Sequence, residues 1–380
     1  MLIQTGLDVN RLRDWGTMPS SPVRAGGVPG FLQQDKWGPR GGTVKVNLKT
    51  LSNSLGLSRT TVSRALNGYD DVSEATRERV RKAAQALGYH ADPTARRLAT
   101  GRAEAVGIVY PFGVGDLGDT RFGEVVAGMT ESLAVRDLDL IIVSARRNAE
   151  LETYRRLVDS RLVDGLIVAR TLVDDPRIHF LQEQNFPFIA YGRTNSSVPY
   201  GWFDFDNEAG ARAAAQRLIA FGHRKIALVS APQTISFAAQ RRAGFVNALR
   251  EAGIQPGASL MIESSFDRKG GYDAMRALLE LADPPSAVLV DNNIAGAGAL
   301  RAIGDSGRKP GTDISLIVYD GVPPDVAFPY TVTAVAQPTG HLSGKIIAGL
   351  IMDEIADRGR CQHHLAQPCI EPGDTDGLLR

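Results

Sequence analysis

Cysteine is almost missing from this 380-residue chain, because the two that it has, Cys361 and Cys369, both lie near the C-terminal end. Two cysteines exclude a framework of several disulfides and a four-cysteine zinc site. The chain also lacks an apolar run of the ~18–20 residues that a membrane-spanning helix needs. Its N-terminus has no basic segment followed by an apolar core, the pattern of a secretory signal. We therefore expect a cytoplasmic protein without contact to a membrane.

Motifs for nucleotide cofactors and catalytic metals are absent as well. No GxGxxG follows the first expected strand, and no GxxxxGK[ST] occurs in the chain. The pair His363-His364 has no further metal-ligand residues at useful spacing. An enzyme that used Asp320 as a base would lack a second catalytic group in any recognisable motif. We expect no enzyme, no cofactor and no metal.

The composition that is present belongs to a globular protein, with 43% hydrophobic and 22% charged residues. The length suggests two or three domains. Residues 44–102 carry 11 Lys/Arg against 5 Asp/Glu, whereas residues 103–380 carry 27 against 34. A small basic domain attached to a larger acidic one indicates a polyanion as the partner of the first domain.

The first 43 residues differ from the rest of the chain. They are rich in Gly, Pro and polar residues, as in residues 20–22 (SSP) and 26–30 (GGVPG), and they show no sustained apolar period. Such a segment can bury too little apolar surface to offset its loss of chain entropy. Residues 1–43 are therefore predicted to be a disordered extension.

Residues 44–90 show the helical period. Their apolar positions recur three or four residues apart: Leu48, Leu51 and Leu55, then Val62 and Leu66, then Val80, Ala83, Ala84 and Leu87. Gly56 interrupts the first run, and Ser58 and Ser73 are placed to cap the second and third helices. Three short helices with a tight turn between the first two predict an all-α helix-turn-helix headpiece.

Residues 91–102 predict a fourth, short helix. Asp92 is suited to the position that caps a helix and Pro93 to the first helical position, and the segment ends at Gly101. Because it comprises only about two turns, it is too short to be stable alone. We expect this hinge helix to fold only against a partner.

Residues 103–372 alternate short apolar runs with helical segments. The runs are 105–110, 138–144, 164–169 and 187–191, followed by 225–230, 260–263, 286–291 and 314–319. This alternation predicts the α/β class, with two lobes that each contain a doubly wound parallel sheet. Ligands of such pairs bind at the carboxyl ends of strands, in the cleft between the lobes. Residues 373–380 remain as a tail.

The stretch from Leu55 to Gly68 (LGLSRTTVSRALNG) carries a specific pattern. It resembles the headpiece G-[VL]-S-x-x-T-V-S-R-x-L-N of the lactose/galactose repressor (LacI/GalR) family of bacterial transcription regulators. The resemblance continues through residues 72–77 (VSEATR) and 87–89 (LGY), and covers roughly residues 46–372. It implies a periplasmic-binding-protein-like effector domain and a repressor whose affinity for DNA is controlled by a small sugar.

The resemblance also implies the residues that touch DNA. In a helix-turn-helix the first residues of the second helix point at base edges in the major groove. An arginine there can pair with both acceptors of a guanine, while hydroxyls suit phosphate oxygens. The expected DNA-binding residues of the headpiece are Ser58, Arg59, Thr60, Thr61, Ser63, Arg64 and Asn67.

In the hinge, Leu98 matches the leucine that the family inserts into the minor groove at the centre of the DNA site. Such a wedge unstacks a base step and bends the duplex. Ala95 and Arg96 lie beside it and are expected to contact DNA too. An ordinary contact between domains is the alternative interpretation of Leu98.

The resemblance assigns a sugar site to the effector domain. Arg241 matches the arginine of an RxxGF segment that reaches the ligand, Asp320 an acid that takes sugar hydroxyls, and Phe266 an aromatic plate. The expected ligand-binding residues are Arg241, Phe266, Asn292, Asp320, Gln337, Tyr191 and Arg193. Converging polar groups and one aromatic face suit a polyol, whose hydroxyls must be paired when buried. Each of these residues could instead have a structural role.

Two positions depart from the family's pattern. Asn293 stands where an acid usually follows the asparagine, and Gly192 stands where an acid usually precedes the arginine. Residues 191–193 (YGR) and 200–207 (YGWFDFDN) are similar to members that respond to α-glucosides. The resemblance therefore adds an α-glucoside to the candidate sugars, while the two departures leave the ligand open.

The assembly that the resemblance implies is a homodimer on pseudo-palindromic double-stranded operator DNA. Residues 371–380 hold no leucine heptads, so a tetramerising coiled coil is not expected. The competing interpretation is a soluble sugar-binding protein without DNA regulation. It would account for residues 105–370 but would leave the headpiece and the hinge unexplained.

Deletion of residues 1–43 is expected to leave the fold, dimerisation and operator affinity nearly unchanged, because the segment offers no periodic apolar positions to bury. Thermal melting and operator titration of the shortened chain beside the full chain measure this. A large fall in either quantity would show that the extension is a working part of the protein.

Overall fold

The computed structural model describes residues 46–89, 101–110, 120–145 and 149–379, and the chain divides into two compact units between Ala91 and Asp92. We call the first unit the headpiece and the second the effector unit. The expected extension and nearly all of the expected hinge helix, with Ala95, Arg96 and Leu98, lie outside the described residues.

The headpiece comprises α1 (Leu48–Leu55), α2 (Arg59–Leu66) and α3 (Glu74–Ala86). Each helix begins at a polar side chain that accepts a hydrogen bond from a backbone N–H three residues later. Asn47 caps α1, Ser58 caps α2 and Ser73 caps α3. The predicted caps at Ser58 and Ser73 are confirmed. Gly56, with φ +64°, ends α1 in the left-handed conformation that glycine adopts without strain.

A small apolar core joins these helices. Its buried members are Leu51, Leu55, Val62, Ala65, Val72, Val80 and Ala84. One expected member is wrong: Leu87 is 39% exposed. The reason is that α3 ends at Ala86, so Leu87 follows the last helical residue as its cap and no longer shares the inward face.

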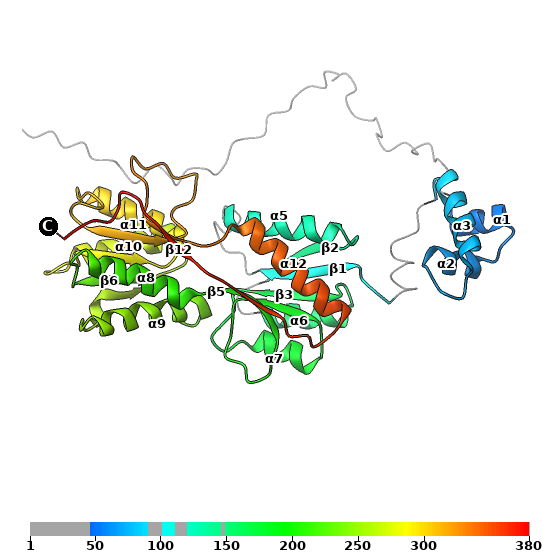
Figure 1. Ribbon diagram of the computed structural model, residues 1–380, viewed down its shortest axis with the longest axis horizontal. Coiled ribbons are helices and arrows are strands. Elements are labelled where there is room, and N and C mark those ends of the chain that lie inside the picture. The colour runs from blue at the N-terminus through cyan, green and yellow to red at the C-terminus, as the bar shows by residue number, and fades with distance from the viewer. Residues whose placement is uncertain (1–45, 90–100, 111–119, 146–148, 380) are drawn as a thin grey trace, which may run out of the picture. The chain divides into compact units, whose positions relative to one another are not determined.

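The effector unit contains two α/β lobes (Figure 1). Lobe 1 has a six-stranded parallel sheet in the order β11-β5-β4-β3-β1-β2. Its strands are β1 (Ala105–Tyr110), β2 (Asp139–Ser144), β3 (Gly165–Ala169), β4 (Phe188–Tyr191), β5 (Gly201–Phe205) and β11 (His363–Ala366). Helices pack on both faces: α5 (Thr120–Ala134) and α12 (Gly340–Ala356) on one, α6 (Glu150–Asp159) and α7 (Pro176–Glu183) on the other.

Lobe 2 repeats this design with the strand order β12-β10-β9-β8-β6-β7. All neighbours are parallel except the edge strand β12, which is antiparallel to β10. Its strands are β6 (Ile226–Ser230), β7 (Met261–Glu263), β8 (Ala287–Val290), β9 (Ser315–Tyr319), β10 (Ala334–Ala336) and β12 (Cys369–Glu371). Its helices are α8 (Asn207–Ala220) and α9 (Ser236–Glu251) on one face, α10 (Arg268–Leu279) and α11 (Asn293–Asp305) on the other.

The sequence of the central strands explains this layering. Every residue of strands β1, β3, β6, β8 and β9 is buried, and the strands are apolar runs except for Ser230 at the end of β6 and Ser315 at the start of β9. Such runs are typical of parallel strands that helices cover on both faces. The prediction of two doubly wound parallel sheets is therefore confirmed, with the expected apolar runs corresponding to eight of the strands within about two residues of their ends.

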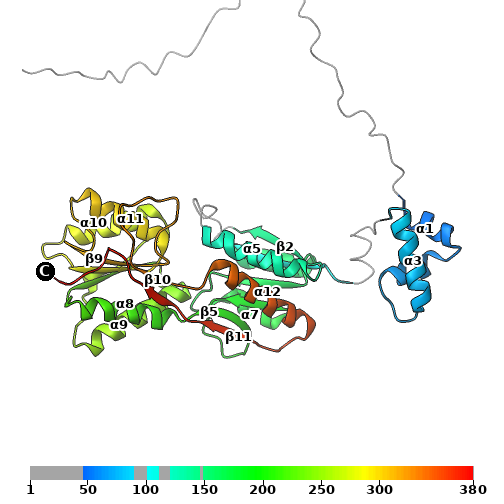
Figure 2. The same cartoon turned by 45° about the horizontal axis from the view of Figure 1, so that its top comes forward.

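Four strands were not predicted: β5, β10, β11 and β12. Strand β5 (GWFDF) contains a glycine and an aspartate, β10 and β12 have three residues each, and β11 begins with two histidines. These strands carry the crossings between the lobes. The chain passes from β5 to α8, from β10 to α12 and from β11 to β12. The last of these three crossings is the red segment in Figures 1 and 2.

The C-terminal segment after β12 is part of lobe 2 and not a separate tail. Thr375 is fully buried, donates to the Leu316 carbonyl at 2.8 Å and accepts from the Thr333 amide. The carboxylate of Asp376 is also buried, and pairs with Arg217 and with the Thr333 hydroxyl. These contacts tie the end of the chain to β9 and α8.

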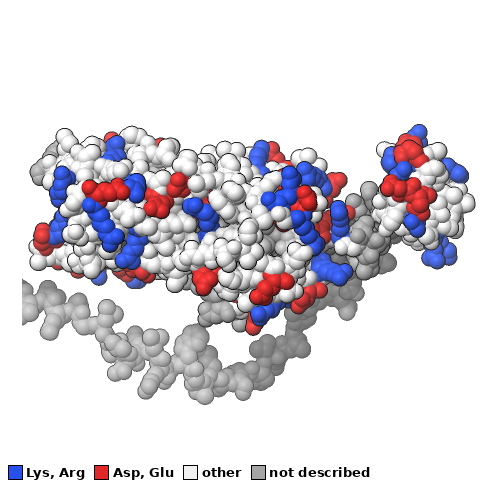
Figure 3. All heavy atoms as spheres, turned by 60° about the horizontal axis from the view of Figure 1, so that its bottom comes forward, with Lys and Arg blue, Asp and Glu red and all other residues white. Residues whose placement is uncertain are grey.

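None of the described helices is long and apolar enough to cross a membrane. On the face drawn in Figure 3, basic and acidic side chains are interspersed over the effector unit without a broad area of one sign. This face therefore offers a polyanion no extended basic surface.

Truncation after Gly373 is expected to lower the stability of lobe 2 by roughly 2–4 kcal/mol, because it leaves the buried Thr333 and the Arg217 guanidinium without their partners. Chemical denaturation measures the change. Removal of 378–380 alone is the control, since Leu378 is 70% exposed. Equal stability of the two truncated chains would contradict the role given to Thr375 and Asp376.

Candidate functional site

Helix α2 of the headpiece divides its side chains between the core and the solvent. Val62 and Ala65 are buried, whereas Arg59, Thr60 and Arg64 are exposed. Ser58, Thr61, Ser63 and Asn67 border this exposed face. The Ser58 and Thr61 hydroxyls lie 2.8 Å apart, and the Thr61 amide donates to Ser58. The structure thus brings the seven expected headpiece residues to one short helix and its two ends.

Arg64 has a partner that the sequence did not reveal. Its Nε donates to Asp71 Oδ1 at 3.0 Å and its Nη2 lies 2.7 Å from Asp71 Oδ2, while the guanidinium sits 4.9 Å from the ring centroid of Tyr69. Such an exposed pair adds little to stability. It does fix the direction of the arginine, and it leaves Nη1 without a partner among the described residues. A guanidinium held along one edge can present its other edge to two base acceptors.

The effector unit holds a cavity between its lobes, which we call the inner cavity. The space open to the centres of water molecules is about 150 Å³, within a hollow of about 880 Å³ that includes solvent at its mouth. The carboxyl ends of strands from both sheets supply its wall: Tyr110, Arg170, Tyr191 and Asp204 from lobe 1, with Asn292, Asp320 and Gln337 from lobe 2. This is where parallel sheets bind ligands.

Six of the seven expected ligand residues line the inner cavity: Arg241, Phe266, Asn292, Asp320, Gln337 and Tyr191. Arg193 is not among the lining residues. Its Nε donates to Asp204 Oδ2 at 2.7 Å, so Arg193 forms an ion pair with a carboxylate whose residue lines the cavity. Burial raises the pKa of Asp204, while the guanidinium of Arg193 lowers it.

Arg241 is held in place before any ligand arrives. It is 5% exposed, its Nε donates to Asn207 Oδ1 at 2.9 Å, and a second nitrogen donates to the Asp291 carbonyl. Its guanidinium carbon lies 3.7 Å from the ring centroid of Tyr319. An arginine fixed in this way loses little conformational freedom when it binds a ligand.

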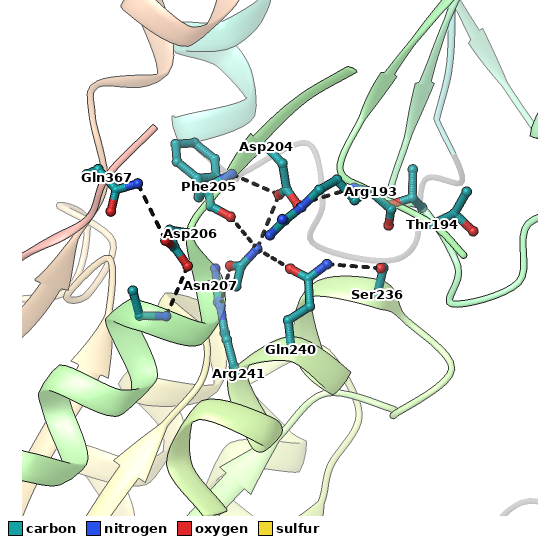
Figure 4. A network of polar contacts seen from close by, with 12 residues as sticks. Arg193, Thr194, Asp204, Phe205, Asp206, Asn207, Ser236, Gln240, Arg241 and Gln367 are labelled. Carbon is teal, nitrogen blue, oxygen red and sulfur yellow. Dashed lines mark hydrogen bonds and ion pairs between the residues drawn. The ribbon is translucent and has the colours of Figure 1, made fainter. Parts of the chain in front are cut away.

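A polar network connects Arg241 to lobe 1 across the first crossing (Figure 4). Asn207 receives the Arg241 hydrogen bond and donates to Asp204 Oδ1 at 3.2 Å, and Asp204 in turn binds Arg193. Asn207 also donates to Gln240 at 3.0 Å. Asn207 and Asp204 therefore join the guanidinium groups of the two lobes, and neither was expected from the sequence.

Asp320 joins the lobes at a second place. Its Oδ1 lies 3.1 Å from Nη1 of Arg121 on α5, and Arg121 also donates to the Pro338 carbonyl at 3.1 Å. Asp320 and Arg170 both adopt left-handed backbone conformations, with φ 60° and 49°. Non-glycine residues in this conformation cost of order 1 kcal/mol each and gather at functional sites. Arg121 lies in the first turn of a helix without a motif, so the sequence gave no signal for it.

The side-chain amides of Asn292 and Gln337 at the cavity differ in how many of their polar atoms are already hydrogen-bonded within the protein. Asn292 caps α11: its Oδ1 accepts from the Ala295 amide and its Nδ2 donates to Asp291, each at 2.8 Å. The Nε2 of Gln337, in contrast, is buried and has no hydrogen-bond partner among the described residues. An unpaired buried donor costs about 1–3 kcal/mol, and a ligand oxygen would satisfy it.

Gly192, one of the two departures from the expected pattern, has a steric reason. Its φ is +114°, and a Cβ at this position would lie 2.3 Å from the hydroxyl of Thr171. A side chain at this position would require a strained backbone and a shift of Thr171, which favours glycine over the acid of the family's pattern. The other departure, Asn293, is buried and lines the cavity as the first residue of α11.

In the part of the chain that the structure describes, no three His, Cys, Asp or Glu residues are grouped to hold a metal ion. The carboxylates of Asp204 and Asp320 are each paired with an arginine. The inner cavity combines aromatic faces with fixed hydrogen-bond donors, a combination that can bind a polar ligand.

Comparison with known proteins relates the headpiece and the effector unit to the same protein family. Residues 103–370 match the sequence model described as periplasmic binding proteins and sugar binding domain of LacI family, and residues 52–92 match that of bacterial regulatory proteins, lacI family. The chain belongs to the LacI family. The match over 52–92 accounts for the headpiece, which a sugar-binding protein without DNA regulation would leave unexplained.

Individual LacI-family members extend the likeness. The transcriptional regulator RafR of Escherichia coli is 42% identical over 80% of this chain and 91% of its own length. A transcriptional regulator CelR–cellobiose complex is 30% identical, with a TM-score of 0.66 over 87% of this chain and 99% of its own. The lac repressor dimer bound to operator and the anti-inducer ONPF is 26% identical, with a TM-score of 0.74 over the same shares. As a LacI-family member, the chain is a transcription regulator with a helix-turn-helix.

Arg64→Ala is expected to weaken binding to an operator selected from random duplexes by about 5–150-fold, the equivalent of ~1–3 kcal/mol of base discrimination, and to change binding to unrelated duplex far less. Fluorescence anisotropy with both duplexes measures this. Arg81→Ala, at an exposed arginine of α3, is the control. Equal losses on both duplexes would show that Arg64 contacts only phosphates.

Proposed function

We propose that this LacI-family regulator is a sugar-responsive repressor that binds a pseudo-palindromic operator as a homodimer. The inner cavity is the sugar site, and its occupancy changes operator affinity. The DNA-binding part of the proposal rests on the exposed face of α2, with Arg64 oriented by Asp71. Because the target is bacterial chromosomal DNA, the place of action is the cytoplasm, and no catalytic step is needed.

One observation carries the choice of ligand: the inner cavity presents pre-oriented donors beside aromatic faces. Arg241 is fixed by Asn207, the buried Gln337 Nε2 has no partner among the described residues, and Phe266 and Tyr191 supply rings. Vicinal hydroxyls pair with such donors, and the apolar face of a sugar ring packs on an aromatic plate. The cellobiose held by a 30% identical relative supports a glycoside as the ligand class, and the resemblance of residues 191–193 and 200–207 keeps α-glucosides among the first candidates.

The two lobes supply the means by which a ligand can act at a distance. Besides the network through Asn207 and Asp204, they touch at the Arg121–Asp320 ion pair and at a backbone bridge. In this bridge the Val173 amide donates to the Thr234 carbonyl at 3.0 Å and the Ser236 amide to the Thr171 carbonyl at 2.9 Å. A sugar that recruits Asp320 competes with Arg121. The resulting change in lobe angle would shift the dimer interface and the folding of the hinge segment, which is an order–disorder switch.

Arg241→Ala is expected to retain operator binding and to lose the response to sugar. Asp320→Ala also breaks the ion pair with Arg121, so it is expected to lose the response to sugar while its operator affinity shifts toward that of the sugar-bound chain. Each removal leaves buried sugar hydroxyls unpaired, which corresponds to about 5–150-fold in sugar affinity. Calorimetry with monosaccharides and disaccharides gives the affinity, and operator titration with and without sugar gives the response. Arg242→Ala is the control, because this neighbour on α9 does not line the inner cavity. Unchanged sugar affinity in both test variants would remove these residues from the site.

A further inference from the structure

A second cavity lies beside the inner cavity, and we call it the outer cavity. Both lobes build it: Glu150, Leu172 and Pro176 come from lobe 1, and Thr234, Ile235 and Ser265 from lobe 2. It encloses about 1,230 Å³ including its open side. It is bordered by the backbone bridge, since Leu172 and Ile235 are the bridged residues. Of the residues expected from the sequence to bind ligand, Phe266 alone lines the outer cavity, and it also lines the inner cavity.

The two cavities share one wall, made of Arg170, Phe237 and Phe266. Arg170 lies with its guanidinium carbon 5.0 Å from the ring centroid of Phe266 and 4.6 Å from that of Tyr110. Phe237 and Phe266 meet edge to face with their centroids 6.1 Å apart. The same aromatic rings are therefore available on the inner and the outer side.

Polar atoms without partners face the outer cavity from both lobes. Glu150 uses Oε2 to bind Arg177 at 2.6 Å, while its Oε1 makes no hydrogen bond among the described residues. Within the same ranges, the side-chain hydroxyls of Thr234 and Ser265 make none either. One carboxylate acceptor and two hydroxyls can thus pair with hydroxyl groups of a bound molecule.

The charges at the outer cavity favour a neutral occupant. Arg177 is 3% exposed and is bound by two carboxylates, Glu150 and the fully buried Asp175. The Arg170 charge is the only further one on this wall among the described residues, so the four groups together carry no net charge. A phosphorylated ligand would find no excess positive charge here, whereas a polyol requires none.

From this arrangement we propose that the outer cavity is a second sugar subsite and that the natural effector is an oligosaccharide whose chain passes the shared wall. One unit binds among Arg241, Asp320 and Gln337, and a further unit binds between the aromatic wall and the Glu150, Thr234 and Ser265 side chains. The inference rests on the proposed function of the inner cavity and names the ligand's size class. Because both lobes contribute polar atoms to the second subsite, a longer ligand also links the lobes more firmly than a short one.

Calorimetry with sugars of increasing length tests the proposal on the full-length chain. The series are glucose, maltose and maltotriose; glucose, cellobiose and cellotriose; and galactose, melibiose and raffinose. In at least one series, affinity is expected to rise by about tenfold or more when a unit is added. Ser265→Trp, which fills the outer cavity from an exposed position, is expected to abolish that gain and to leave the affinity for the shorter sugar within about twofold. Thr234→Val, which removes one hydroxyl, is expected to lower the affinity for the longer sugar several-fold.

Ser197→Trp is the matched control, because Ser197 is an exposed serine that lines neither cavity. It is expected to bind every sugar as the unchanged chain does. If lengthening never raises affinity, or if Ser265→Trp affects short and long sugars alike, the second subsite is refuted while the inner site stands. If no sugar of any length binds, the proposed function itself fails.

Discussion

Arg241 is only 5% exposed, and the protein itself holds its guanidinium in place through the Asn207 side-chain amide, the Asp291 carbonyl and the ring of Tyr319. Since Asn207 follows the first crossing between the lobes, the same hydrogen bonds that hold Arg241 reach Asp204 and Arg193 in lobe 1. The donor geometry of the inner cavity thus depends on the relative placement of the lobes. A ligand that binds Arg241 senses that placement, and lobe movement in turn alters the site.

The contacts between the lobes differ in how easily a ligand can replace them. The backbone bridge at Thr171–Val173 and Thr234–Ser236 consists of two main-chain hydrogen bonds, so it does not depend on the identity of the side chains. In the Arg121–Asp320 pair the side chains are 26% and 12% exposed, so the arginine is partly open to solvent, and Asp320 lines the cavity. Sugar hydroxyls can take over the carboxylate and release Arg121. The bridge would then act as a pivot and the ion pair as the replaceable contact.

The sequence predicted the parts of the fold that follow from local pattern. Continuous apolar runs located the central strands, and the side chains directly after them, such as Asn292 and Asp320, fell at the cavity because parallel strands end at one edge. Leu87 was misplaced because the end of α3 decides its face, and β5 was missed because Gly201 and Asp204 break its apolar pattern. Partners such as Arg121 for Asp320 and Asp71 for Arg64 depend on distances between elements, which no local period encodes. The resemblance placed Arg193 in the cavity, and the buried Asp204 explains why it points elsewhere.

The coupling between sugar binding and operator binding is reciprocal by thermodynamic necessity. The most direct test is the sugar affinity of the dimer measured twice, without DNA and with saturating operator, under the same salt. The account predicts two different dissociation constants whose ratio equals the change that saturating sugar produces in operator affinity. Identical sugar affinities in the two states would contradict it, because a ligand that binds both states equally shifts neither.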